Sequence, residues 1–434
     1  MKVMMRKELL GRMFRTAAMI MIISMLAGAC SKNNGPEKPE DNTGQTTGPG
    51  GNGSGDQGNS GNEGGSGDEG GNEGGTSGGD HGGSGDSGDQ GGSGDSGSGG
   101  SGGSGDQGDQ PKPQITANSW MTAIDDDTKI ALLTIPGTHD AATSTCAGPG
   151  KCQTLTISGQ LEHGVRAFDL RPTMDDNSTL GNIYHSILDT DVSMGDAMEY
   201  FDSFLKAHPG EGIIVIMRYE SERQILGSIA EDNYKTAMKN FLWDSRIYQS
   251  RMAAFNRSMT MKDLRGKILI ISRNDLSPVS TFETAYTQWS HSNSVGEALQ
   301  IYGTGGLGRI YVQDMYSAEK NGNSSEADFL AKKKELVCKL LDITVPFREY
   351  EQNNWVINYC SGYAGSSFAS DSYAKNAAST NPAALEHIQA HTGKGFTGIV
   401  MMDYAGTDTY EVGGSTFSVS GKSLTEALIM NNFQ

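Results

Sequence analysis

The sequence predicts an α/β fold, a (β/α)8 TIM-type barrel that is regular or irregular in detail, and three observations support it. Short apolar runs rich in β-branched residues recur, as expected of parallel strands buried on both faces. Mostly helical-looking stretches separate these runs. Polar side chains follow many of them directly, where the carboxyl ends of barrel strands meet. The runs are residues 130–135, 165–170, 213–217, 268–271, 310–312, 355–359 and 399–402.

Residues 1–29 precede this domain and are typical of a bacterial lipoprotein signal peptide. A basic start is followed by an apolar run, residues 17–26, that is too short for a stable membrane span. The run ends in Leu-Ala-Gly-Ala before Cys30. We therefore expect Cys30 to be lipidated and to hold the protein, surface-exposed, on the bacterial cell envelope. The alternative is an ordinary secretory signal with a chance cysteine.

Residues 30–113 form a Gly/Ser/Asp-rich tether. More than half of the 60 glycines of the chain lie between Gly35 and Gly108, with almost no apolar side chains among them. No core can offset the cost of ordering such a segment, so we expect it to be disordered. A Gly-rich chain of about 80 residues spans roughly 50 Å end to end. The tether would hold the remaining domain, residues 114–434, well off the membrane.

The charge of the chain limits its partners. The net charge is −18, of which residues 1–30 carry +4 and residues 31–113 carry −11, leaving −11 for the domain. This acidity argues against nucleic acid as the main partner but does not exclude a membrane.

Four cysteines lie in the domain, and the leader implies export to a setting that permits disulfides. Cys146 and Cys152 could close a small ring, and Cys338 and Cys360 are either a second pair or buried thiols. Their spacing resembles no zinc site.

Three short segments carry a residue set suited to cleaving a phosphodiester: residues 135–140, 168–171 and 183–186. They hold two histidines, two aspartates and one arginine. One imidazole can take a proton from the attacking hydroxyl, and the other can give a proton to the leaving oxygen. The arginine can offset charge that builds on the phosphoryl oxygens. Such a set needs no metal.

Polar residues two apart follow three of the apolar runs. Side chains two apart on a strand share a face, so we expect these pairs to line one pocket for a polyhydroxylated ligand. The alternative is a set of salt bridges at the barrel mouth. The pairs are Asp169/Arg171, Arg218/Glu220 and Asp314/Tyr316. Arg273 and Asp403 follow two further runs.

Eight segments between Trp120 and Ala405 resemble, in order, the bacterial phosphatidylinositol-specific phospholipases C. They are residues 135–140, 160–171, 184–185, 215–220, 268–273, 312–316, 355–361 and 400–403. The resemblance implies a phosphatidylinositol diacylglycerol-lyase, which releases diacylglycerol and inositol 1,2-cyclic phosphate. Glycosylphosphatidylinositol (GPI) anchors are a further substrate that it suggests.

The resemblance also implies catalytic roles. His139 matches the general base that deprotonates the inositol 2-hydroxyl, and Asp403 the aspartate that orients it. His185 matches the general acid for the diacylglycerol oxygen, and Asp140 its paired carboxylate. Because adjacent strand residues diverge, we expect Asp140 to be poorly placed to hold its neighbour His139. Arg171 matches the arginine that contacts the phosphate, with Asp169 beside it.

The remaining positions match residues that bind inositol. Hydroxyl contacts are implied for Arg218, Glu220, Arg273 and Asp314, and ring packing for Tyr316. Arg218 stands where family members often have lysine, so tolerance of different headgroups can differ. Family members usually carry exposed tryptophans at the pocket rim. The loop after Asp140 has none. Residues 361–375 contain Tyr363, Phe368 and Tyr373 instead, and these rings could either insert into a membrane or pack in the core.

No metal or other cofactor is expected, because Arg171 stands where calcium-dependent relatives hold calcium. Asp175-Asp176 is interpreted as a solvated turn. The expected partner is phosphatidylinositol or a GPI-anchor lipid in a membrane, with no nucleic acid, and the protein is expected to be a monomer. Two alternatives are a metal-dependent glycerophosphodiester-type phosphodiesterase and a non-catalytic inositol- or glycan-binding lipoprotein. The other histidines of the domain are expected to be structural or exposed: His163, His208, His291, His387 and His391.

Overall fold

The computed structural model describes residues 115–434 except residues 176, 221–230, 244–245, 277–283, 290–293, 304, 319–324, 345 and 392–397. The predicted signal peptide, Cys30 and the whole predicted tether fall outside the described residues, as do Asp176 and His291. Among the described residues, no helix is both long enough and apolar enough to cross a membrane.

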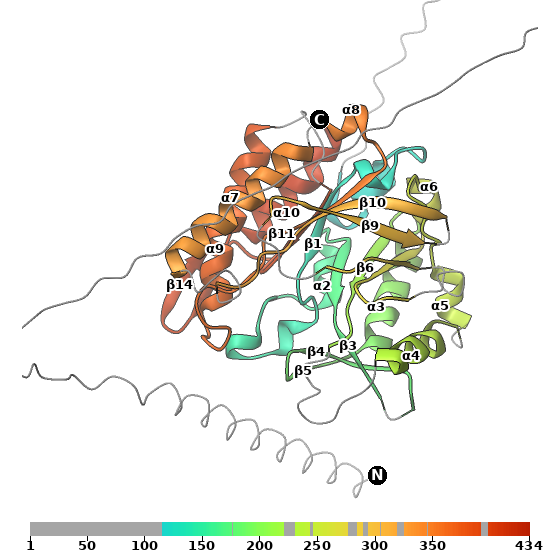
Figure 1. Cartoon of the computed structure of the whole chain (residues 1–434), viewed down its shortest axis with the longest axis horizontal. Coiled ribbons are helices and arrows are strands. Elements are labelled where there is room, and N and C mark those ends of the chain that lie inside the picture. The colour runs from blue at the N-terminus through green and yellow to red at the C-terminus, as the bar shows by residue number, and fades with distance from the viewer. Residues whose placement is uncertain are drawn as a thin grey trace, which may run out of the picture. The chain divides into compact units, whose positions relative to one another are not determined.

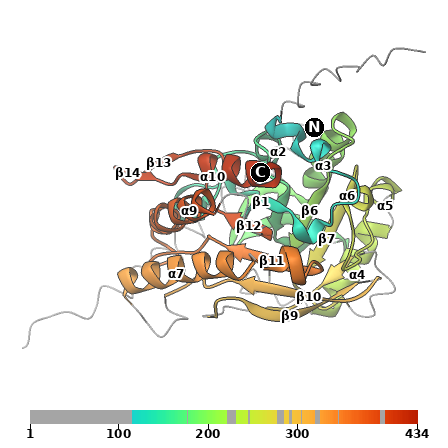
Figure 2. The ribbon, with the colours of Figure 1, turned by 90° about the horizontal axis from the view of Figure 1, so that it is seen from above.

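A closed barrel of nine strands, counted over the described residues, forms the centre of the domain (Figures 1 and 2). Around the barrel the order is β1 (Thr134–Thr138), β12 (Gly398–Met402), β11 (Asn354–Tyr359), β10 (Gly306–Gln313), β9 (Glu297–Gly303), β8 (Ala285–Tyr286), β7 (Ile268–Ser272), β6 (Ile213–Met217) and β2 (Ala167–Leu170). Every neighbouring pair is parallel except the two that β9 makes. Each predicted apolar run therefore overlaps a parallel strand.

Burial on both faces explains why these runs are strands. All five residues of β1, β6, β7 and β12 are buried, as expected for parallel strands covered inside and outside. In β6, Ile214 and Ile216 join the cluster inside the barrel, whereas Val215 joins the cluster beneath the outer helices. The first predicted run is shifted, because Ile130–Leu132 form a 3-10 helix and β1 begins only at Thr134.

The expected eight-fold alternation of strand and helix is not found. β9 is antiparallel to both neighbours, and β9 and β10 follow each other as a hairpin without a helix between them. Burial in β9 alternates, and the first half of β10 is mostly exposed, as expected of antiparallel strands with one face toward water. In the described part of the chain, Figure 2 shows no helix outside β9. The barrel is therefore mixed.

Helices surround the rest of the barrel. They are α2 (Ile157–Glu162), α3 (Met194–Ala207), α4 (Glu231–Trp243), α5 (Arg246–Arg251), α6 (Met261–Leu264), α7 (Glu326–Thr344), α8 (Phe347–Tyr350), α9 (Ser372–Ala390) and α10 (Gly421–Met430). A side sheet of β3 (Pro172–Met174), β4 (Leu180–His185) and β5 (Leu188–Ser193) follows β2. Ser193 and Asp196 form a capping box where α3 begins, which satisfies two backbone N–H groups at that end.

The segment after Gly406 lies outside the barrel strands and packs against β1 through α10. It forms a hairpin of β13 (Thr409–Val412) and β14 (Ser415–Ser418), followed by α10. Beyond α10, the Asn432 side chain accepts from Thr134 N at 2.9 Å and donates to Thr134 O at 2.9 Å. These two bonds satisfy the backbone of β1 at the end opposite His139, so the C-terminus helps to hold the strand that leads into the predicted site.

Candidate active site

The predicted catalytic residues meet at one mouth of the barrel. His139 and Asp140 follow β1, Asp169 lies in β2, and Asp403 follows β12. His185 comes from outside the barrel, since it ends β4 of the side sheet. Both histidines are 8% exposed, so a ligand can reach them while most of each ring stays dry.

His139 is held through both ring nitrogens. Its Nδ1 lies 2.9 Å from Asp403 Oδ1, and its Nε2 lies 3.2 Å from Asp140 Oδ2. Gln153, which the sequence analysis did not single out, donates from Nε2 to the carbonyls of His139 at 2.8 Å and Met402 at 2.9 Å. This amide joins the ends of β1 and β12. The separation between the His139 imidazole and the Asp403 carboxylate is therefore fixed.

The expectation that Asp140 is poorly placed to hold His139 is wrong. It assumed that strand geometry continues to residue 140, but β1 ends at Thr138. Asp140 adopts a positive φ of 43°, a conformation that aspartate tolerates better than most residues. The turn places its carboxylate against both imidazoles, because Oδ2 also lies 3.4 Å from His185 Nε2.

His185 has a defined orientation. Its Nδ1 lies 3.0 Å from the carbonyl oxygen of Gly150, which can only accept, so Nδ1 carries a proton and donates. Its Nε2 lies 3.0 Å from the hydroxyl of Tyr373, and the two rings meet edge to face at 5.4 Å. Nε2 is therefore the nitrogen that can exchange a proton with a ligand.

Arg171 lies among three carboxylates. Its Nε is 3.0 Å from Asp140 Oδ1, its Nη2 is 2.9 Å from Asp169 Oδ2, and its Nη1 is 4.0 Å from Glu220 Oε2. The guanidinium is mostly buried, with 13% of the side chain exposed. One arginine thus offers a partly exposed positive charge beside Asp140, the carboxylate that contacts both imidazoles, and a phosphate would be attracted there.

The charges of this cluster determine its protonation. Burial lowers the pKa of His139, but the carboxylates of Asp140 and Asp403 outweigh it and raise the pKa to about 8. Burial also raises the pKa of Asp140, yet the charges of Arg171 and the two imidazoles bring it down to about 2. Burial raises the pKa of Asp403 although His139 opposes the shift. At neutral pH, His139 is mainly protonated and Asp140 is ionised.

Asp403→Asn is expected to move the pH dependence of activity. A general base must be neutral to act, so kcat/KM should rise with pH through the His139 pKa of about 8. Removing the Asp403 charge lowers that pKa, and the acidic limb should move down by about one pH unit. The rate at the plateau should fall about 10²-fold or more, because asparagine favours the wrong tautomer.

The measurement is kcat/KM against pH for the wild type and Asp403→Asn. Asp408→Asn is the matched control, because Asp408 also follows β12 but its carboxylate binds Ser423 instead. Asp408→Asn should leave the acidic limb of the kcat/KM profile at the wild-type pH. If the acidic limb of Asp403→Asn lies at the same pH as that of the wild type, Asp403 does not act on the titrating imidazole.

The residues predicted to bind inositol form a second group. Arg273 Nη2 lies 3.2 Å from Asp314 Oδ2, and Trp289 Nε1 donates to the same oxygen at 2.9 Å. The Arg273 guanidinium lies 4.2 Å from the centre of the Trp289 ring. The sequence analysis did not identify Trp289 as a site residue. It is separated from Arg273 along the chain and follows β8, a strand of only two residues.

The other predicted contacts lie around these two groups. Arg218 follows β6, and its charge is one of those that lower the pKa of Asp140. Glu220 is buried beside Arg171. Tyr316 is half-buried and faces Tyr363, with 6.3 Å between the ring centres. Their roles toward inositol stay predictions.

The three aromatic residues considered for membrane contact differ in how far their side chains are buried. Tyr373 is buried and contacts His185. Tyr363 is half-buried and lies 6.1 Å from the Tyr373 ring. Phe368 is 61% exposed. Only Phe368 of the three therefore has a ring that is mainly in water.

All four described cysteines are free thiols: Cys146, Cys152, Cys338 and Cys360. Cys152 is fully buried, with Sγ 4.0 Å from Asp140 Oδ2. Together with His139 and Asp140 it forms a group whose donor atoms lie close enough to share a metal ion. Burial raises the pKa of its thiol well above the usual value, which disfavours the thiolate that a metal would need.

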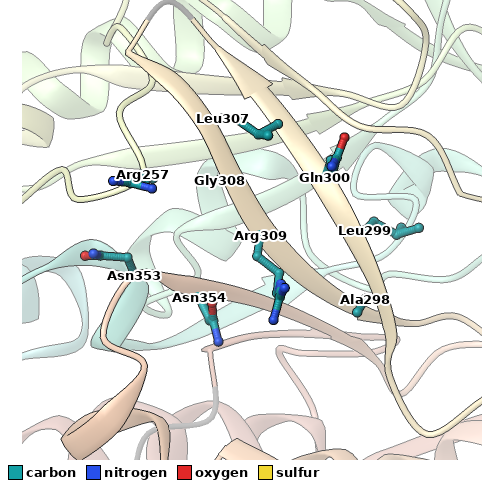
Figure 3. A pocket seen from close by; sticks show the side chains of 9 residues that line it. All are labelled: Arg257, Ala298, Leu299, Gln300, Leu307, Gly308, Arg309, Asn353 and Asn354. Atoms are coloured by element: carbon teal, nitrogen blue, oxygen red, sulfur yellow. The ribbon is translucent and has the colours of Figure 1, made fainter. Parts of the chain in front are cut away.

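A cavity of about 520 Å³ lies on another part of the barrel, at β9, β10 and the start of β11 (Figure 3). Its lining contains Arg257, Arg309, Asn353 and Asn354 but none of the predicted site residues. It lies where the β9–β10 hairpin has replaced a covering helix, and we assign it no catalytic role.

Comparison with known proteins supports the family resemblance found in the sequence. Residues 137–274 match the family described as "Phosphatidylinositol-specific phospholipase C, X domain". The 1-phosphatidylinositol phosphodiesterase of Listeria monocytogenes is 36% identical over 170 residues, covering 38% of this chain and 51% of that protein. The protein of the same name from Staphylococcus aureus is 25% identical over 299 residues, covering 66% and 88%. The chain thus aligns with about half of the first relative's length.

Solved structures share the fold. A phosphatidylinositol-specific phospholipase C from Staphylococcus aureus matches with a TM-score of 0.56 at 23% identity, covering 74% of this chain and 98% of that one. The phosphatidylinositol-specific phospholipase C of Listeria monocytogenes matches with a TM-score of 0.50 at 23% identity, covering 74% and 100%. Residues 137–274 therefore match that family model, and the chain is similar to the bacterial phosphatidylinositol-specific phospholipases C in sequence and in fold.

Proposed function

We propose that this chain cleaves phosphatidylinositol to diacylglycerol and inositol 1,2-cyclic phosphate. The relatives from two organisms are 1-phosphatidylinositol phosphodiesterases, which supports the substrate. One observation carries the proposal: the Asp140 carboxylate contacts both imidazoles through one oxygen and Arg171 through the other. A base, an acid and a cation are thereby gathered within the reach of one phosphodiester.

The reaction is an intramolecular displacement at phosphorus. In the neutral form of His139, Nε2 takes the proton of the inositol 2-hydroxyl, because Nδ1 keeps its own proton and donates it to Asp403. The 2-oxygen forms the new bond to phosphorus, and the bond to the diacylglycerol oxygen breaks. His185 Nε2 gives its proton to that oxygen, because its Nδ1 is engaged by the carbonyl of Gly150. Arg171 offsets the charge on the phosphoryl oxygens.

The mechanism that we propose needs no metal. Its support is Arg171, a fixed cation that already lies within 3.0 Å of Asp140 and within 2.9 Å of Asp169. A metal-dependent phosphodiesterase of the glycerophosphodiester type would use those carboxylates as metal ligands, and here a guanidinium occupies them. GPI anchors, which contain the same inositol phosphodiester, are a further proposed substrate.

The deciding experiment is turnover of phosphatidylinositol vesicles by the protein in excess EDTA, with ³¹P NMR of the products. A cyclic phosphodiester signal that persists in EDTA is the expected result. Turnover that starts only when calcium is added would replace the proposal with the metal-dependent class. Binding of inositol without turnover in either condition would leave a non-catalytic surface lipoprotein.

Tyr373→Phe is expected to lower kcat about five- to tenfold, because one hydrogen bond to His185 is lost while the ring contact remains. Tyr363→Phe is the matched control, since it removes a hydroxyl from the neighbouring ring, and it should keep kcat within about twofold. The measurement is kcat for both variants. Equal effects in the two would mean that the Tyr373 hydroxyl does not position His185.

We also propose where the enzyme works. The signal peptide and Cys30 support a lipid anchor on the bacterial cell envelope, and the tether supports a domain that reaches a separate lipid surface. Phe368, with 61% of its surface exposed, is the proposed contact with that lipid. We also propose that the protein is a monomer.

A further inference from the structure

A second cluster of polar side chains lies far from the catalytic residues. Asp342 lies in the last turn of α7, His387 in the last turn of α9, and His391 directly after α9. The two helices pack against each other over much of their length. Tyr373, in the first turn of α9, reaches the active site, and His387 lies about 20 Å further along the helix. The cluster is therefore at the opposite end of the barrel.

The three side chains converge on one point. His387 Nε2 lies 3.0 Å from Asp342 Oδ1. The two imidazoles, four residues apart, stack with ring centres 4.3 Å apart. One donor atom from each of the three residues lies within 4.8 Å of the others. Around a tetrahedral zinc ion the ligand atoms lie about 3.4 Å apart, so small side-chain rotations complete the geometry.

The local backbone leaves the right nitrogen of His391 available. Its Nδ1 lies 2.8 Å from the carbonyl oxygen of His387. A carbonyl only accepts, so Nδ1 carries the proton and Nε2 keeps its lone pair. Metal-bound histidines usually have this arrangement, in which the second nitrogen donates to a carbonyl or carboxylate. The tautomer needed for a ligand is therefore present before an ion binds.

We propose that Asp342, His387 and His391 bind a divalent cation of the zinc class and so join α7 to α9. Two imidazoles and a carboxylate with one open position form a recognised zinc donor set. Calcium and magnesium prefer all-oxygen sites and should bind poorly. Asp342 is 58% exposed, whereas His387 is 15% exposed, so an ion can enter from the side of Asp342. These two histidines were expected to be merely structural or exposed.

The test is thermal unfolding of the full-length protein without a histidine tag, with and without ZnCl2. At zinc about 100-fold above the dissociation constant, Tm should rise by about 4 °C. His391→Gln and Asp342→Asn should each lose most of this rise. Magnesium chloride at the same concentration should leave Tm unchanged. Turnover measured at the same zinc concentration should also be unchanged, because the site is remote from the catalytic residues.

His163→Gln is the matched control. His163 also directly follows a helix, α2, and its Nδ1 lies 3.1 Å from the carbonyl four residues earlier. It thus has the local bond of His391, but it is not in either group of potential metal ligands found among the described residues. It should keep the full rise in Tm.

Three outcomes would overturn the proposal. No rise in the wild type would show that the cluster binds no zinc. An equal rise in His391→Gln would place the ion elsewhere, as an adventitious ion only or at His139, Asp140 and Cys152. Loss of turnover that parallels the rise in Tm would favour that catalytic group.

Discussion

His139→Ala is expected to lower the turnover of phosphatidylinositol by about 10⁴-fold, because it removes the proposed general base. The imidazole is the only described group that contacts both Asp403 and Asp140 through opposite nitrogens, and alanine can replace neither contact. KM should change much less than kcat, since the lost interaction acts on the proton in transit. Initial rates on vesicles, with ³¹P NMR of the products, measure the effect.

His208→Ala is the control for this variant. His208 directly follows α3, and its ring packs on Phe204. Its loss should leave turnover within about twofold, as for most substitutions outside a site. Thermal unfolding checks that both variants fold. A folded His139→Ala protein with more than a few per cent of wild-type activity would contradict the assigned role.

Arg171→Lys is expected to lower kcat by about 10²- to 10³-fold although the charge is kept. The guanidinium contacts Asp140 and Asp169 through different nitrogens, and an ammonium group cannot hold both while facing a phosphate. Arg171→Ala should lose more activity and also stability, about 3 kcal/mol or more, because it leaves buried carboxylates without their cation.

The comparison with Arg273→Lys distinguishes a contact that binds substrate from one that stabilises the transition state. Arg273 pairs with Asp314 and lies over Trp289, in the group predicted to bind inositol. Its substitution should mainly raise KM, because the contact is the same in the ground state and the transition state. If Arg171→Lys likewise raised only KM, Arg171 would be a binding residue rather than a group that stabilises the transition state.

The residues of the predicted site were readable from the sequence for a simple reason. Parallel strands in a barrel bring their carboxyl ends to one mouth, so side chains at or just after the ends of β1, β2 and β12 must meet. His139, Asp169 and Asp403 follow this rule. The short apolar run that contains or precedes each of them identifies the strand.

Features that depend on turns and on distant chain contacts were not readable. The alternation rule failed at Asp140, because a positive φ replaced the strand geometry. β9 was missed because its burial alternates and its sequence has no continuous apolar run. The Tyr373 hydroxyl reaches His185 across 188 positions of the sequence, and local pattern carries no information about such a pair.

The sequence by itself determined the barrel class and seven of its strands and predicted the residues that meet at the barrel mouth, because buried periodicity and strand-end chemistry are local properties. Only the tertiary structure decided that His185 reaches the site from a side sheet, that one carboxylate serves both imidazoles, and that Asp342 meets His387. These contacts join segments whose approach is determined by packing. Packing is a property of the whole domain, so the distances that define the chemistry appear only when the chain is folded.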